Sequence, residues 1–128
     1  MPAYRRSYPE VKMVAAPYSP EMLIEAADRA GYAVVLSREP GKARLRFTRL
    51  LKGRPVGGGL LGRMGLHRRA TVAYRAQPPA PTLGDWWDEG GFVPGNRIRT
   101  HLQWSPRLGC YEAVWWNATT VLKAGSRR

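Results

Sequence analysis

The chain has few residues of the types that would indicate disulfides, metal centres or a membrane location. It has one cysteine, Cys110, so no disulfide can form within it, and a lone thiol fits a reducing compartment. Two histidines and one cysteine cannot complete a structural zinc site, and we expect neither a metal nor a cofactor. The apolar runs are far shorter than the ~20 residues of a spanning helix. We therefore expect a cytoplasmic protein without a membrane span.

Acidic residues are also scarce, and the basic residues that outnumber them are unevenly distributed. The 128 residues include 21 Lys and Arg against nine Asp and Glu, which gives a net charge of +12. Residues 38–75 hold eleven of the basic residues and one acid, Glu39, so this segment alone carries +10. Charge this concentrated creates a strong local potential and indicates a polyanionic partner. Seventeen of the basic residues are arginine, whose planar fork grips phosphate.

Length and composition predict a single small globular domain. Hydrophobic residues make up 44% of the chain, which is enough for a packed core and too many for a disordered protein. We place the domain at 19–122, after an extended arm at 1–18 whose prolines oppose a helix, and before a basic tail at 123–128. Within the domain, the glycine-rich basic stretch 52–69 is predicted to be a flexible loop.

One helix and two hairpins are predicted within this domain. Ser19 is a good N-cap and Pro20 suits the first helical position, so a helix should run to about Ala30 and end at Gly31. The predicted strands are 32–38 and 44–51, joined by a type II turn, then 70–77, and finally 97–104 paired with 110–122. Together they predict an α+β fold, with the N-terminal helix packed on a mostly antiparallel sheet of about four to six strands.

The alternation within the strands places arginines on one face of the sheet. Arg44 and Arg46 alternate with apolar Leu45 and Phe47, and the strand at 97–104 has a similar pattern. We predict that this face and the basic loop bind nucleic acid, with RNA or single-stranded DNA slightly favoured. The predicted contacts are Arg38, Arg44, Arg46, Arg49, Arg54, Arg63, Arg68, Arg69, Arg97 and Arg99. Trp86 and Trp87 are candidates for stacking on bases or for anchoring a protein partner.

Two other functions stay open on the sequence alone. A small, metal-independent, toxin-like endoribonuclease would need an acid and a base, and the candidates are His67, His101 and Glu112. The chain shows no specific catalytic motif, so we expect a binding protein more than an enzyme. The second alternative is an inhibitor or adaptor that docks on an acidic protein. The sequence does not indicate an oligomeric state.

Overall fold

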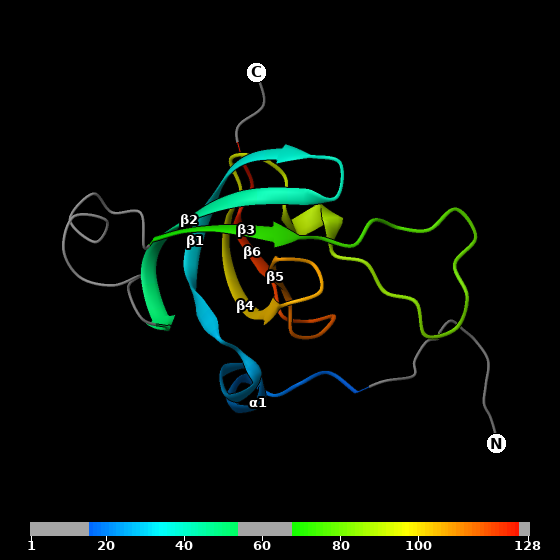
Figure 1. The fold of residues 1–128 in the computed structure, drawn as a ribbon, viewed down its shortest axis with the longest axis horizontal. Coiled ribbons are helices and arrows are strands. Elements are labelled where there is room, and N and C mark those ends of the chain that lie inside the picture. Colours follow the sequence, from blue (N-terminus) through cyan, green and yellow to red (C-terminus); the bar gives the residue numbers. More distant parts are fainter. Residues whose placement is uncertain (1–15, 54–67, 126–128) are drawn as a thin grey trace.

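Six strands form one sheet, and five of them close into a barrel. The computed structural model describes residues 16–53 and 68–125. The strand order is β1-β2-β3-β5-β4-β6, and β1 also pairs with β4, which closes the barrel and leaves β6 beside β4. The strands are β1 (Arg29–Glu39), β2 (Lys42–Lys52), β3 (Arg69–Ala73), β4 (Arg97–Ser105), β5 (Cys110–Ala113) and β6 (Thr120–Lys123). Figure 1 shows the helix α1 (Pro20–Ala26) at one end of this barrel.

The predicted α+β class and mostly antiparallel sheet agree with the structure, whereas barrel closure was not predicted. All strand pairs are antiparallel except β3–β5, which is parallel. The first half of β1 pairs with β4 while most of its length pairs with β2, and three register shifts bend it. β-Bulges of this kind bend a strand and increase its local twist, which lets β1 curve so that the sheet closes on β4. Within the described residues, no helix is long and apolar enough to cross a membrane.

The first hairpin forms as the sequence predicts, but its strands are longer. Gly41 has φ +85°, the left-handed conformation that the third position of a type II turn requires, and Pro40 precedes it. Each strand of the hairpin has eleven residues, so β2 extends to Lys52. The predicted loop therefore loses its two ends, because Lys52 belongs to β2 and Arg69 begins β3. Residues 54–67 of that loop lie outside the described residues.

The helix is shorter than predicted. Ser19 is the N-cap as expected, and its Oγ accepts a hydrogen bond from the Met22 backbone at 3.2 Å. The helix ends at Ala26 rather than near Ala30, because the next residues bond to β4 instead. The Asp28 amide donates to the Leu102 carbonyl at 2.7 Å, and β1 then begins at Arg29. Pairing with β4 thus overrides the helical propensity of this segment.

Gly31 lies inside β1 and does not end a helix. A Cβ added there would collide with the backbone carbonyl oxygen of Arg49 on β2, so the glycine allows the two strands to approach closely. The sequence prediction was wrong about the role of this glycine, since a glycine after an alanine-rich segment is also typical of a helix end.

The predicted strands nearer the C-terminus are interrupted in the structure. The strand expected at 70–77 is β3, which ends at Ala73. The strand expected at 110–122 is two strands, β5 and β6, which both pair with β4. A turn separates them, in which the Ala118 amide donates to the Trp115 carbonyl at 3.2 Å. Lys123, assigned to the tail from the sequence, belongs to β6.

Apolar side chains from alternate strand positions fill the barrel. Its largest fully buried side chains are Phe47, Phe92, Leu45, Ile98 and Leu102. A second cluster includes Leu23 of α1, Val114 and Ala118, with Trp115 packed against it. Because strand side chains alternate between the two faces, the residues next to the inward-facing ones point to the outside of the barrel. This alternation places the arginines of β2, β3 and β4 on the outside.

Candidate functional site

A row of basic residues crosses the outside of the barrel from β6 to β3. The strand register places Lys123 opposite Arg97, Arg97 opposite Val34, Val34 opposite Arg46, and Arg46 opposite Arg69. We call this set the cationic row. Neighbouring strands lie about 5 Å apart, so four long basic side chains and one valine follow one another across the sheet. The row joins both predicted hairpins on one surface.

A second, shorter row runs beside the first. Tyr32 of β1 lies opposite both Arg99 of β4 and Arg49 of β2. The tyrosine is half-buried, and the two arginines flank its position in the sheet. Arg44 on β2 adds a further cation, opposite Ser37 and Thr71. The outer cationic face consists of Arg44, Arg46, Arg49, Arg69, Arg97, Arg99 and Lys123.

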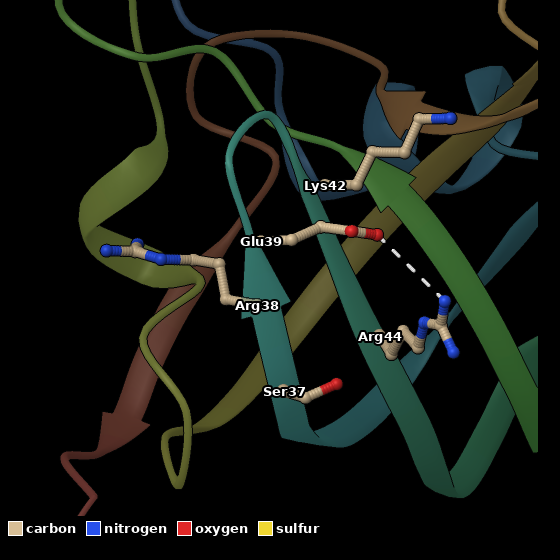
Figure 2. A pocket seen from close by; sticks show the side chains of 5 residues that line it. All are labelled: Ser37, Arg38, Glu39, Lys42 and Arg44. Carbon is tan, nitrogen blue, oxygen red and sulfur yellow. Dashed lines mark ion pairs between the residues drawn. The ribbon is translucent and has the colours of Figure 1, made fainter.

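Like charges stand directly opposite one another on this face. Arg46 opposes Arg69, and Arg97 opposes Lys123. Cross-strand pairs of like charge are destabilising, since their Cβ atoms are only about 5 Å apart. The described residues offer little compensation, because the ion pair on this face joins exposed Arg44 and Glu39 at 3.9 Å. Such an exposed pair contributes little to stability. Figure 2 shows Glu39 turned toward Arg44.

The acids near η3 (Glu89–Gly91) lie outside this face and bond to the chain itself. Asp88 Oδ1 accepts from the Arg75 amide at 2.7 Å, and Glu89 Oε2 accepts from the Gln77 amide at 3.1 Å. Burial raises the pKa of Asp88 above its ordinary value. Asp85 Oδ2 accepts from the amide and hydroxyl of Thr82, and these bonds lower the pKa of Asp85. These carboxylates hold loops in place rather than pair with the outer cationic face.

Two shallow hollows lie on the outside of the β1–β2–β3 sheet. One has a volume of about 250 Å³ and is lined by Leu36, Arg44, Leu45, Arg69, Ala70 and Thr71. The other, of about 160 Å³, is lined by Ser37, Arg38, Glu39, Lys42 and Arg44 near the hairpin turn (Figure 2). Both are smaller than the ~300–1,000 Å³ of a typical small-molecule site. An extended ligand that lies across the surface suits this shape better than an enclosed one.

Two arginines predicted as contacts are bonded to backbone carbonyls. Arg38 Nη1 donates to the Glu89 carbonyl at 2.9 Å, and its guanidinium lies 5.2 Å from the centre of the Tyr74 ring. Figure 2 shows Arg38 directed away from Arg44. Arg68 Nη1 lies 3.3 Å from the Thr48 carbonyl, at the irregular part of β2. Both side chains therefore hold loop and strand segments together. Arg54 and Arg63 lie outside the described residues.

The two candidate tryptophans lie in different surroundings. Trp86 is half-buried against the second cluster, and the Arg75 guanidinium covers its ring at 3.9 Å. Trp87 is 38% exposed and lines a groove of about 460 Å³ together with Trp116 and Val121. None of the groove-lining residues belongs to the outer cationic face. Trp86 therefore has a packing role, and only Trp87 is accessible to a partner.

The candidate catalytic residues do not form a visible acid–base pair. His101 is buried, its Nδ1 donates to the Ala118 carbonyl at 2.9 Å, and burial lowers its pKa. Glu112 accepts a hydrogen bond of 3.4 Å from Gln103. Within residues 16–53 and 68–125, no hydrogen bond joins His101 to Glu112, and no metal-binding cluster of His, Cys, Asp and Glu is found. His67 lies outside the described residues.

We expect His101 to make the protein less stable as the pH falls below about 6.5. Because the pKa of His101 is depressed in the folded state, the unfolded chain binds a proton first, and stability is lost as the pH falls through the folded pKa. Urea unfolding of the parent and of a His101→Gln variant, from about pH 8 to about pH 5, measures this contribution. The two curves should converge at acid pH, and the raised pKa of Asp88 affects both equally. Parallel curves would contradict this assignment.

Two residues of the cationic rows were missed by the sequence analysis. Lys123 was assigned to the tail, and Tyr32 was placed in a strand without a functional role. Lys123 lies opposite Arg97 and Tyr32 lies opposite Arg99, and these pairings show that both residues belong to the rows. The register between strands that are distant in the sequence cannot be derived from one sequence alone.

Comparison of the chain with protein-family models, with curated proteins and with solved structures finds no match.

Proposed function

We propose that the protein binds nucleic acid through the outer cationic face, with RNA or single-stranded DNA slightly favoured. The observation that carries this proposal is the cationic row, in which Arg46 opposes Arg69 and Arg97 opposes Lys123. Such pairs cost stability in the free protein, and a polyanion lying along the row would remove that cost. Residues that destabilise a fold are typical of binding sites, where function and stability compete.

The repeated spacing favours a polymer over a small anion. Cations follow one another across several strands. The second row lies two residues away along β1 and β4, or about 7 Å, and three residues away along β2, where the pairing shifts register. A phosphate backbone offers charges at regular intervals to such an array, and arginine binds each one with two parallel hydrogen bonds. Tyr32, between Arg49 and Arg99, adds a ring on which an unpaired base could stack. The ring is the reason to favour single strands.

The strand topology supports the same proposal by analogy. A five-stranded barrel with the closed order β1-β2-β3-β5-β4 and a parallel β3–β5 pair has the strand order of the OB-fold. OB-fold barrels bind oligonucleotides on the face formed by β2 and β3, where Arg44, Arg46 and Arg69 lie in this chain. A shared topology does not determine a function, so this likeness adds to the argument from charge and does not replace it.

The structure gives less support to the two alternative functions. An endoribonuclease that used His101 as its acid or base would need this side chain to reach a substrate, yet it is only 5% exposed and bonded to Ala118. An acidic protein could bind the same cationic face. Binding measurements with nucleic acids distinguish this alternative from the proposed function. The groove beside Trp87 offers a further surface for protein contacts.

Binding to labelled RNA, single-stranded DNA and duplex DNA of one sequence, over a series of salt concentrations, tests the proposal. Single strands should bind more tightly than duplex, and the logarithm of the affinity should fall linearly with the logarithm of salt. Each phosphate contact contributes about −0.7 to that slope for a single strand, so about five engaged cations give a slope of about −3.5. No binding at low salt would sink the proposal and direct attention to an acidic protein partner.

A further inference from the structure

Among residues 16–53 and 68–125, the strand β6 forms an open edge of the sheet. It ends the strand order, and within the described residues it pairs with β4 alone. All four of its residues are exposed, including Val121 at 42% and Leu122 at 50%. An edge strand presents unpaired backbone donors and acceptors to any chain that can lie beside it, and proteins normally protect such edges with charge. Here the only charged residue is Lys123, at the end of the strand.

Apolar side chains surround this edge. The groove of about 460 Å³ has Trp87 and Trp116 among its lining residues, and they are 38% and 40% exposed. Val121 of β6 lines the same groove. Gly90 also lines it, and a Cβ added there would meet no atom within 4 Å, which leaves space above the backbone. An open edge beside exposed tryptophans is typical of an interface between proteins.

We propose that two copies of the chain pair through β6, antiparallel about a two-fold axis, so that their outer cationic faces form one surface. A two-fold contact must be self-complementary, because the same patch meets itself. The short strand meets this condition, since pairing centred on Val121 or on Leu122 places an apolar residue opposite its own symmetry mate. In both registers Lys123 faces an uncharged residue rather than the other lysine.

The position of β6 explains why a second copy is the expected partner. Lys123 of β6 belongs to the cationic row, opposite Arg97. In this antiparallel pairing the two-fold axis is perpendicular to the joined sheet. The outer faces of the two barrels therefore lie on the same side of that sheet. The cationic row of one copy would then continue into that of the other. This consequence rests on the proposed nucleic-acid function, and it predicts that one long strand can bind both copies at once.

The proposed β6–β6 contact is small, so we expect the pairing to be weak in the free protein and stronger on a long nucleic acid. Four strand residues and one groove cover less than the ~1,200–2,000 Å² of a stable protein interface. The free protein should therefore dimerise only weakly. A nucleic acid long enough to span two faces holds the copies at a high effective concentration, so it should increase the pairing. We expect cooperative binding to long single strands and simple binding to short ones.

Sedimentation velocity over a range of protein concentrations, and binding to a short and a long strand, test the pairing in the full-length chain. The average mass should rise toward two chains, and the long strand should bind about 10- to 100-fold more tightly than the short one. Val121→Lys should abolish the rise in mass and reduce the length effect to about twofold. Leu83→Lys adds the same charge at a residue that is 75% exposed in another loop, and it should behave like the parent.

Disulfide trapping then identifies the register. Val121→Cys or Leu122→Cys should form a covalent dimer under mild oxidation, whereas Leu83→Cys should not, and the native Cys110 is buried. A single mass at every concentration with no cross-link at β6 would overturn the pairing, and so would a dimer that Val121→Lys leaves intact. The proposed function can fail separately from the pairing. A β6 dimer that binds no nucleic acid would support the pairing and contradict nucleic-acid binding.

Discussion

Replacing both Arg46 and Arg69 by glutamine should weaken binding to single-stranded RNA by about 100-fold at low salt. The two residues lie opposite each other in the cationic row, and each is free to donate a charge-assisted bond to phosphate. Loss of one such bond costs about 1.4 kcal/mol, which is about tenfold in affinity, so two give the expected factor. The salt slope should become shallower by about 1.4, because two phosphate contacts are lost. Anisotropy titrations of parent and variant measure both effects.

The control for this variant carries the same net charge on other surfaces. Met22→Glu with Leu83→Glu also lowers the net charge by two units, at residues that are 47% and 75% exposed and lie in α1 and in a loop rather than in the sheet. It should weaken binding by less than about threefold, through the long-range field alone. Equal losses in both variants would mean that the face has no specific role.

Stability separates a lost contact from a lost fold. Because Arg46 and Arg69 repel each other across the β2–β3 pair, the glutamine variant should be at least as stable as the parent. The backbone carbonyl of Arg69, which accepts from Arg29 at 3.3 Å, is unaffected by the change. A variant that binds poorly and unfolds at a higher denaturant concentration would show directly that this surface trades stability for binding.

Local features of the fold could be predicted from the sequence because adjacent residues determine them. The Ser19 cap and the turn at Gly41 each depend on a few consecutive residues, and both are where the sequence predicts them. The alternation of Leu45 and Phe47 with arginines correctly predicted which side chains are buried in β2. Alternation needs no knowledge of the partner strand, since it only reflects that one face of the strand is wet.

The closure of the barrel could not be predicted, because it depends on pairs distant in the sequence. β1 meets β4 across about seventy residues, and β3 meets β5 in parallel. Such pairing is decided by complementary surfaces of whole strands and not by local propensity. The helix end was missed for the same reason, since the Asp28 amide bonds to β4.

The residue type of the candidate site could be predicted from the sequence, but the role of each individual arginine could not. Clustering indicated arginine as the residue type of the predicted site, but it gave Arg38 and Arg68 the same role as Arg46. In the structure, Arg38 and Arg68 reach backbone carbonyls of other segments. A long guanidinium side chain can satisfy a distant carbonyl as easily as a phosphate, so composition alone cannot separate these uses. His101 was predicted as a candidate acid or base, yet it is buried and its ring bonds to the Ala118 carbonyl.

Phe47→Ala should cost about 3–5 kcal/mol of the free energy of unfolding. Phe47 is fully buried in the barrel and is among its largest side chains, so its removal leaves a cavity that the closed sheet cannot easily fill. A small domain has only about 5–15 kcal/mol in total, so this variant should be close to unfolding. Urea unfolding followed by tryptophan fluorescence should show a much lower midpoint with an unchanged slope.

Leu51→Ala, in the same strand, is the matched control. Leu51 is 41% exposed, so its truncation should change the free energy of unfolding by less than about 0.5 kcal/mol. Phe47 and Arg46 are adjacent and must point to opposite faces of β2. If Phe47→Ala cost no more than Leu51→Ala, Phe47 would not face the interior, and Arg46 would lose its place on the outer cationic face. The folded fraction of Phe47→Ala should still bind RNA as the parent does, because the change lies inside the barrel.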